Sequence, residues 1–447
     1  MIKRCFWLVL FFSHMSDSFS ADLVDARVFN WRFYLQANPD LMSANLVNES
    51  QARSHWLSYG IDEGRQAHPA FQSRQYLDKY PDLVNAFGKG NYRMALSHYL
   101  TYGYNEGRIG YFNQGSYVPS DANIMGKYGR ITISNTSGAE TPDTYYLSAS
   151  VRNAGAIDSI YWNGKELVNS YDHGRQLQYA WQYQSHVNSD NSFSAIFSEC
   201  FNPTEAGSGS DGLSWNSTSI LNTYSYSNGR FDTSSYVAYW SSVGMNNVNV
   251  MDGTPCKTYN LYSSNISNDV LKKSVSIVSS PNVPPSFKLF RINASVNFEA
   301  IASKFGDVAF EAPTIYLAPE LNNMYSLNLQ TNSLLLLSKQ LTSACDAKFW
   351  SLANGCFTNF PVIAATSDGQ YAVGMLFKPL NSLYIFKYGY YYYNQTSLSN
   401  TVGNTTKISV EANFKNMGQP NSFQTYVAIG SLESVRQALN YVFVNTP

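Results

Sequence analysis

The sequence has few charged residues. Asp, Glu, Lys and Arg make up 14% of the 447 residues, and the formal net charge is −1. An average soluble protein has about 25% charged residues. Binding to DNA, RNA or an anionic membrane surface depends on an excess of Lys and Arg. The charge balance therefore gives no support to a nucleic-acid partner or to an anionic membrane.

The sequence also lacks common catalytic fingerprints and a long apolar run. It contains no GxSxG, HExxH, P-loop or dinucleotide-binding motif, which removes most common hydrolase and nucleotide-enzyme classes. After the N-terminal segment the best apolar run is SLLLL at 333–337. A membrane-spanning helix needs about 20 apolar residues, so we expect no membrane span.

The first twenty residues predict a secretory signal peptide. Lys3 and Arg4 form a basic start, and the apolar run CFWLVLFF follows. Ser18 and Ser20 then place small residues at the positions that signal peptidase recognises before residue 21. We therefore expect the mature chain to be secreted or displayed at the cell surface.

Cysteine is scarce, with five residues in the chain, and removal of the signal peptide takes away Cys5. The remaining even number in an exported chain predicts two disulfides. Proximity favours Cys345 with Cys356, which leaves Cys200 with Cys256. No CxxC pair or nearby His supports a zinc site instead.

Aromatic residues are abundant. They make up 15% of the chain, and Tyr alone occurs 34 times. A surface rich in Asn, Ser and Tyr but poor in charge suits neutral ligands. Sugars are the obvious candidates, because aromatic faces stack on sugar rings while amides and hydroxyls bind the rim.

Residues 28–110 contain a tandem repeat. The first copy reads VFNWRFYLQANPDL and then QARSHWLSYGIDEGR, and the second reads AFQSRQYLDKYPDL and then YRMALSHYLTYGYNEGR. A fixed period of this length marks a supersecondary unit that stacks on its neighbour. We place the copies at about 28–70 and 71–113. Because stable arrays usually need three or more copies, we expect these two copies to pack against the rest of the chain.

Each copy has a helical pattern and predicts a helical hairpin. Gly60 and Gly103 lie where a helix end would need a left-handed residue. His55 and His98 recur and invite a catalytic reading, but a repeated His more simply packs one helix on the next. Two Glu-Arg pairs of the closing turn could bridge one repeat to the next: Glu63 with Arg65, and Glu106 with Arg108.

The motif Y-x-x-x-x-P-D-L followed by H-Y/W-L-x-Y-G-x-x-E-G-R resembles a short repeat of exported bacterial proteins. That repeat often lies beside carbohydrate-active or surface domains. The resemblance implies an accessory or attachment module at about 21–115, and it carries no catalytic residues.

From about residue 120 to 447 the sequence predicts β structure. Short stretches such as TYYLSASV and SIYWNG run in Val, Ile, Tyr and Trp, and Asn163-Gly164 is a favoured hairpin turn. Only the final SLESVRQALNYVF has a helical period. The fold class is therefore mainly β, with a large antiparallel β-sandwich preceded by two helical-hairpin repeats. The run YGYYYY at 388–393 predicts a strand that packs in the core or offers a sugar platform.

The densest polar cluster lies at 158–215. Asp172, His173 and Arg175 share a sharp bend, and Glu205 follows in a loop. A His beside carboxylates and an Arg is a workable acid/base set, so these four are our candidate catalytic residues.

Two aromatic residues and one further acid complete this candidate site. Trp181 and Trp215 are the candidate ligand-binding rings. In the structural alternative, Asp172 pairs with Arg175, His173 caps the turn and Glu205 anchors a loop. No cofactor is expected, although Glu205, Asp211 and loop carbonyls could hold calcium.

The segment AIDSIYWNGKEL, followed by DHGRQLQ, is similar to the opening of galactose-mutarotase-like supersandwich domains. Those domains occur in aldose epimerases and in β domains of polysaccharide lyases and several glycosidases. The resemblance implies a sugar-handling fold. The epimerase pairing of a His with a distant carboxylate has no secure counterpart, because His173 and His186 are the only histidines of the β part.

Two functional hypotheses follow. The first is a secreted carbohydrate-binding or carbohydrate-processing protein whose partner is an extracellular polysaccharide. The second is a noncatalytic cell-surface or adhesion protein in which the sandwich is a scaffold. The first requires the candidate side chains to converge on a concave face with exposed rings.

Overall fold

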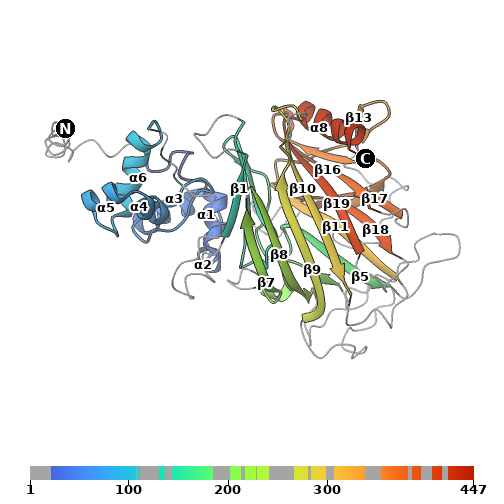
Figure 1. Ribbon diagram of the computed structural model, residues 1–447, viewed down its shortest axis with the longest axis horizontal. Helices are drawn as coiled ribbons and strands as arrows, with labels where there is room; N and C mark the ends of the chain where they lie inside the picture. Colours follow the sequence, from blue (N-terminus) through green and yellow to red (C-terminus); the bar gives the residue numbers. More distant parts are fainter. Residues whose placement is uncertain are drawn as a thin grey trace.

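The protein is mainly β, with helices in the N-terminal part, as the sequence predicts (Figure 1). The computed structural model describes residues 22–106, 108, 110, 130–135, 143–184, 202–212, 217–227, 229–240, 266–279, 283–298, 307–337, 354–380, 385–393, 405–414 and 421–446. The predicted signal peptide and the predicted boundary near 115–120 lie outside these residues, so both stay predictions.

The two repeats have the same succession of helical segments. In the first repeat they are α1 (Trp31–Ala37), α2 (Pro39–Ser43), α3 (Glu49–His55) and a π-helical turn (Trp56–Gly60). In the second they are α4 (Ser73–Lys79), α5 (Pro81–Phe87), α6 (Tyr92–His98) and a π-helical turn (Tyr99–Gly103). A side-chain cap begins α1 and α3, where Asn30 and Asn48 accept from the backbone N–H three residues on.

Gly60 and Gly103 are required for close packing, not for a left-handed backbone. Neither has a positive φ, so the prediction of left-handed residues is wrong. A Cβ on Gly60 would overlap the Tyr34 hydroxyl, and a Cβ on Gly103 would overlap that of Tyr76. The left-handed residue of the first turn is Gly64, with φ 63°.

The recurring histidines hold the helices of each repeat together. The Tyr34 hydroxyl lies 2.8 Å from Nδ1 of His55, and the Tyr76 hydroxyl lies 3.0 Å from Nδ1 of His98. Burial lowers the pKa of both histidines, which favours the neutral ring. The packing interpretation of His55 and His98 is therefore confirmed.

The Glu-Arg pairs stay inside their own repeat, so the expected bridge between repeats is wrong. Arg65 pairs with Glu63 and lies 2.8 Å from Asp40 of the same repeat. The second copy is similar, because Arg108 pairs with Glu106 at 2.7 Å and with Asp82 at 2.9 Å. An inter-repeat ion pair comes from elsewhere, between Arg93 and Asp62 at 2.7 Å.

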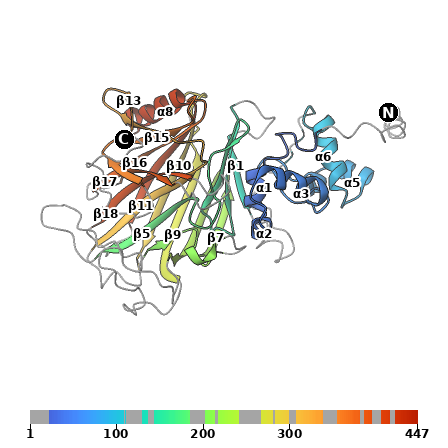
Figure 2. The same cartoon turned by 180° about the vertical axis from the view of Figure 1, so that it is seen from behind.

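The strands form two antiparallel layers, seen from the front in Figure 1 and from behind in Figure 2. Sheet A has, in spatial order, β7 (Ile220–Ser227), β8 (Arg230–Tyr239), β9 (Ile266–Ile277), β10 (Lys288–Asn297), β19 (Asn421–Gly430), β16 (Ala372–Pro379), β15 (Val362–Ala365), β12 (Asn323–Asn328) and β13 (Ser333–Leu336). Sheet B has β1 (Arg130–Ser134), β2 (Tyr145–Ser150), β3 (Ile157–Trp162), β5 (Leu177–Gln184), β11 (Asp307–Leu317), β18 (Thr405–Phe414), β17 (Ile385–Tyr393) and β14 (Asn354–Thr358). The short strand β4 (Lys165–Glu166) pairs with β3, and β6 (Pro203–Thr204) joins the layers by pairing with β5 and β8.

The core lies between the two sheets. Phe310 of β11 packs against Phe423 of β19 with ring centroids 5.0 Å apart, and Tyr179 of β5 stacks on the same ring at 6.3 Å. Asn163 and Gly164 both have positive φ, which gives the hairpin turn that the sequence predicts. The sandwich is thus closed by aromatic contacts between strands far apart in the sequence.

Helix α8 (Leu432–Asn445) covers one end of the outer face of sheet A (Figure 1). Its buried residues are Val435, Ala438, Leu439 and Val442, which recur at the spacing of one helical face. They pack on sheet residues that include Leu376 and Tyr426. The part of this face that α8 does not cover carries polar side chains, such as Ser274 and Asn293.

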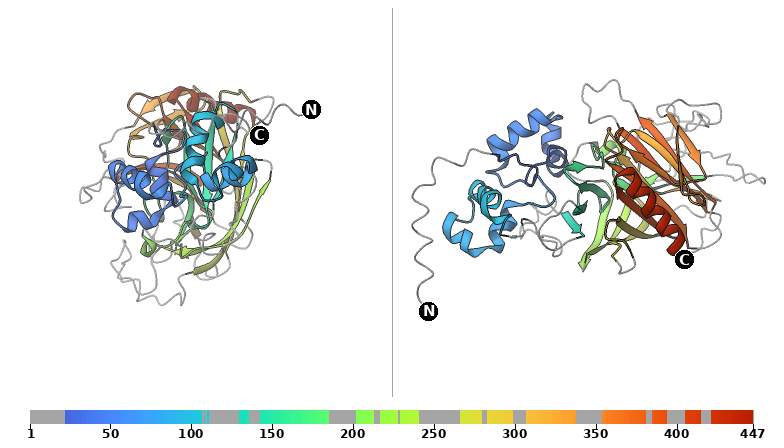
Figure 3. Two further views of the ribbon diagram at one scale, coloured as in Figure 1. Left: turned by 90° about the vertical axis from the view of Figure 1, so that its left-hand side faces the viewer. Right: turned by 90° about the horizontal axis from the view of Figure 1, so that it is seen from above.

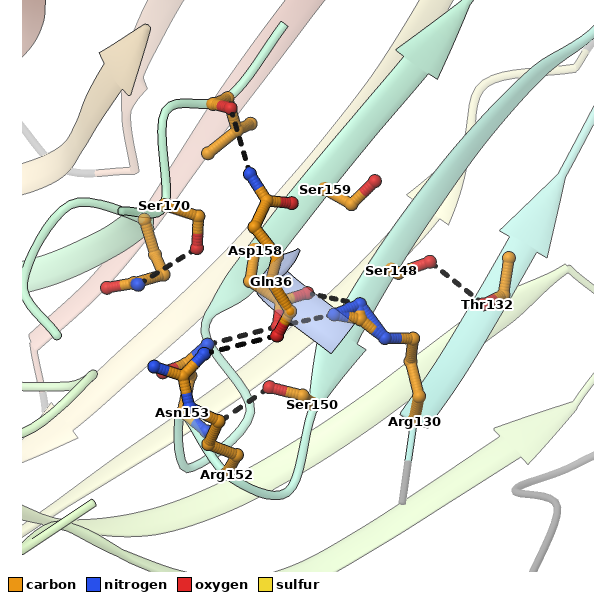
Figure 4. A network of polar contacts seen from close by, with 12 residues as sticks. Gln36, Arg130, Thr132, Ser148, Ser150, Arg152, Asn153, Asp158, Ser159 and Ser170 are labelled. Atoms are coloured by element: carbon orange, nitrogen blue, oxygen red, sulfur yellow. Dashed lines mark hydrogen bonds and ion pairs between the residues drawn. The ribbon is translucent and has the colours of Figure 1, made fainter. Parts of the chain in front are cut away.

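The helical module packs against the edge of the sandwich (Figure 3). This contact is the one expected for an array of only two repeats. A buried polar network lies at this contact (Figure 4). Arg130 forms two hydrogen bonds to Asp158, at 3.1 and 2.8 Å. Gln36 of α1 donates to the Asn169 carbonyl at 3.0 Å, and Arg152 donates to the Gln36 carbonyl at 3.3 Å.

Cys356 is buried in β14 and forms a disulfide bond. Its predicted partner, Cys345, lies outside the described residues, as do Cys200 and Cys256, so the pairing stays a prediction. Among the described residues, no helix is both long enough and apolar enough to cross a membrane.

Candidate functional site

The predicted catalytic residues do not converge on an open face. Asp172 and Arg175 form an ion pair at 3.0 Å. His173 is buried, and its Nδ1 lies 2.9 Å from the Ala206 carbonyl oxygen, which ties the bend to the loop after β6. Burial raises the pKa of Asp172, and the Arg175 charge opposes that shift. The Asp172–Arg175 pair is the one that the structural alternative predicts, whereas His173 contacts a neighbouring loop.

Glu205 is an interior anchor. Its carboxylate is fully buried, pairs with the ammonium of Lys273 on β9 and accepts from the Tyr179 backbone N–H at 3.2 Å. The same ammonium donates to the Gly155 carbonyl at 2.8 Å. Burial raises the pKa of Glu205, and Lys273 opposes that shift. Glu205 therefore connects β9 to the loop beside β5, and its carboxylate is too deeply buried to contact a large ligand.

The remaining predicted site residues are also accounted for. Trp181 is a core residue with 1% exposure; its Nε1–H donates to Asp269 at 3.0 Å and its ring stacks on Phe310. Its ring is therefore not available to stack on a ligand. Trp215 lies outside the described residues. Asp211, proposed for calcium, accepts from Ser208 and Thr218 of its own loop.

A polar groove of about 740 Å³ crosses the outer face of sheet A. Its lining begins on β7, continues over β8, β9, β10 and β19, and ends at Leu380 just after β16. The strands β7, β8, β9, β10 and β19 are neighbours in the sheet, so the groove runs across these five. At a strand spacing of about 4.8 Å they span roughly 19 Å.

The strand register arranges the polar side chains of this groove in two rows. The first row is Ser225, Asp232, Ser274, Asn293 and Gln424. The second row is Thr223, Ser234, Lys272, Ser295 and Ser422. Residues directly opposite in antiparallel strands share a face, so each row is continuous from β7 to β19. We call these ten residues and the space above them the polar groove.

The groove is almost uncharged. Asp232 is paired with Arg230 at 2.6 Å, and Lys272 is exposed. Asn293 and Gln424 bond to one another at 2.9 Å, which fixes two amides in the floor. The rest of both rows consists of hydroxyl side chains. The lining can therefore donate and accept hydrogen bonds along its length with little net charge.

The sequence contains a signal for this groove, although no motif marks it. In β8, β9 and β10 small polar residues alternate with residues that pack inward, such as Phe231, Leu271 and Ile292. The alternation predicts one polar face per strand. It does not predict which strands are neighbours, and only the register brings the separate Ser and Asn residues into rows.

No protein-family model matches this sequence, and no curated protein matches it. Among solved structures, two heparinase III structures are similar to this chain at 11% and 10% identity, with TM-scores of 0.35 and 0.34. Each match covers 91% of this chain but only 55% and 53% of those chains. An alpha-mannosidase from Enterococcus faecalis is similar at 8% identity and TM-score 0.33, over 66% of this chain and 30% of that one. The chain thus spans about half the length of the heparinase III structures.

Proposed function

We propose that this protein is a secreted carbohydrate-binding or carbohydrate-processing protein, and that it binds an extracellular glycan in the polar groove. The observation that carries the proposal is the pair of polar rows across β7 to β19. Secretion rests on the N-terminal signal pattern of the sequence.

The chemistry of the lining favours a neutral glycan. A sugar chain presents hydroxyl groups at short intervals, and the two rows present hydroxyls and amides at the spacing of the strands. A nucleic acid or an acidic polymer would need a cationic surface, whereas the rows hold one Lys and one Asp. A linear, uncharged polysaccharide fits best.

The experiment is a glycan array with two variants. Asn293→Ala together with Ser295→Ala removes one group from each row, and we expect binding to weaken about 30-fold because two hydrogen bonds are lost. Ser276→Ala is the matched control, since Ser276 lies on the same strand face as Ser274 but outside the groove lining. Equal binding by the double variant and the control would remove the groove as the site.

The second candidate is a noncatalytic adhesion function, and one feature of the repeats favours it. Tyr59 and Tyr102 occupy equivalent positions and are 61% and 43% exposed. Each lies against the histidine one turn earlier, at 5.5 Å for His55 and 5.7 Å for His98. If adhesion is the function, Tyr59→Ala with Tyr102→Ala abolishes attachment to cells and leaves glycan binding unchanged.

A further inference from the structure

A second cluster of titratable residues lies on the outer face of sheet B, on the opposite layer from the polar groove. On β18, Lys407, Ser409 and Glu411 alternate with Ile408, Val410 and Ala412. The three apolar residues belong to the core between the sheets. The three polar residues therefore share the outer face.

The strand register places two carboxylates side by side. Glu311 of β11 is directly opposite Glu411 of β18. Like charges directly opposite destabilise a sheet, so this arrangement needs compensation. Lys407 supplies part of it by pairing with Glu311, and its ammonium lies 4.8 Å from the ring of Tyr391 and 5.4 Å from that of Tyr316. Its side chain is 1% exposed, whereas that of Glu311 is 18% exposed.

Glu411 accepts hydrogen bonds from two hydroxyl groups. Its Oε1 accepts from Ser409 at 2.5 Å and from Tyr391 at 3.2 Å. Tyr391 lies over this part of β18 because residue 389 is a glycine. A Cβ on Gly389 would overlap both Ser409 and the Tyr391 ring. The two carboxyl groups therefore have different partners although they are neighbours.

Two features next to this pair are unusual for a plain sheet face. The register of β11 shifts between Glu311 and Thr314 against both of its neighbours, and such bulges often lie next to active sites. Thr314 is fully buried opposite Ser409, and its hydroxyl has no hydrogen-bond partner among the residues that the structure describes. An unpaired buried hydroxyl costs free energy unless another group satisfies it.

We propose that Glu311 and Glu411 form an acid–base site that hydrolyses a glycosidic bond, with Lys407, Ser409 and Tyr391 as positioning residues. The inference rests on the proposed function, which supplies the glycan as the substrate class. Glu411, as the acid, gives its proton to the glycosidic oxygen while the bond from that oxygen to the anomeric carbon breaks. Glu311, as the base, takes a proton from the water whose oxygen bonds to the same carbon.

The two environments suit these roles. Burial, helped by the neighbouring Glu311 charge, raises the pKa of Glu411 to about 7, so a protonated acid is present near neutral pH. Glu311 keeps the ammonium of Lys407 as its ion-pair partner. After each turnover, proton exchange between the two carboxyl groups or with water restores the starting state.

The test separates cleavage from binding. Wild type and variants are incubated with four neutral polysaccharides, a β-glucan, a xylan, a mannan and a galactan, and new reducing ends and binding are both measured. We expect Glu411→Gln and Glu311→Gln to bind the polysaccharides as wild type does. We expect each variant to release reducing ends at a rate at least about 100-fold lower than that of wild type. Glu433→Gln is the control, because it makes the same change of a carboxylate to an amide at an exposed position of α8, on the other sheet.

Tyr391→Phe provides a readout that a purely structural role would not change. The Tyr391 hydroxyl favours the charged form of Glu411, so its removal should move the high-pH limb of the activity profile upward. Binding without any cleavage by wild type, or cleavage unchanged in Glu411→Gln, overturns the inference and leaves the proposed function standing. Failure to bind all four polysaccharides overturns both.

Discussion

At the scale of single residues, each repeat is fixed by a contact among Tyr, His and Gly. Tyr34 reaches His55 across the helical hairpin, and Gly60 leaves the space that the Tyr34 hydroxyl fills. The same arrangement recurs in the second repeat. A side chain at the glycine position would therefore push the tyrosine off the histidine.

Gly60→Ala should destabilise the protein by about 1–3 kcal/mol, which is the usual cost of overpacking a core. Gly90→Ala is the control, because a Cβ there meets no atom within 4 Å. Urea unfolding measures both. Adding Tyr34→Phe should recover part of the loss, since it removes the overlapping oxygen, and a Gly60→Ala variant as stable as wild type would refute the packing account.

Glu166 is a buried carboxylate that has no ion-pair partner in the described part of the chain. One oxygen accepts from three backbone N–H groups, of Ile160, Leu167 and Val168, and the other accepts from Ser159 at 2.5 Å. Burial raises the pKa of Glu166 to about 7. The folded state therefore binds this proton more tightly than the unfolded state does.

The stability that Glu166 contributes should be greatest below its unfolded pKa, near 4.5, and should be lost as the pH rises through about 7. Glu166→Gln cannot ionise. We expect the free energy of unfolding of the variant, relative to wild type, to rise by up to about 3 kcal/mol between pH 4.5 and 8. Urea unfolding at the two pH values measures it, and a pH-independent difference would show that Glu166 does not titrate as described.

At the scale of elements, α8 stabilises the outer face of sheet A through one apolar stripe. Leu439 is fully buried and lies against Gly374 of β16, whereas Phe443, one turn later, is 40% exposed. The helix therefore offers a matched pair of apolar residues with opposite environments.

Leu439→Ala should cost about 2–5 kcal/mol, because it removes buried methyl groups and leaves a cavity. Phe443→Ala should change stability little. Thermal unfolding of the two variants decides the comparison, and similar losses for both would mean that α8 is not docked by this stripe.

The elements also show what a sequence can predict. Helix α8, the hairpin at Asn163-Gly164 and the repeat helices follow from local patterns, because their periods and turn residues are encoded within a few positions. The bend at 172–175 looked like a site because its residue types are functional. The structure uses His173 to tie the bend to a neighbouring loop and Asp172 to pair with Arg175.

The polar groove and the Glu311–Glu411 pair could not be found in this way. The groove takes residues from β7 at 220–227 to β19 at 421–430, the two glutamates are 100 residues apart, and small residues such as Ser295 carry no motif. Only the strand order places Asn293 beside Gln424, and Glu311 beside Glu411. Pairing between distant strands depends on the whole core, which a local pattern does not contain.

At the scale of the whole molecule, the helical module and the sandwich share buried contacts. Gln36 and Arg32 of α1 bond to sandwich residues, the latter to Glu320 at 2.8 Å. His68, near the end of the first repeat, packs edge-on against Tyr161 with ring centroids 4.7 Å apart. The module thus covers one edge of the sandwich and leaves the polar groove and the Glu311–Glu411 pair on two other faces.

The central claim is that the polar groove binds a neutral glycan, and isothermal titration with that glycan at low and high salt tests it most directly. We expect wild-type affinity to change little between about 0.05 and 0.5 M salt, because hydrogen bonds and not ion pairs hold the ligand. Salt screens interactions between charges, with a Debye length of ~10 Å at 0.1 M, and leaves hydrogen bonds between neutral groups almost unchanged. Asn293→Ala with Ser295→Ala should weaken it about 30-fold, and Ser276→Ala should not. Affinity that falls steeply with salt, or that is the same in the double variant and wild type, would contradict the account.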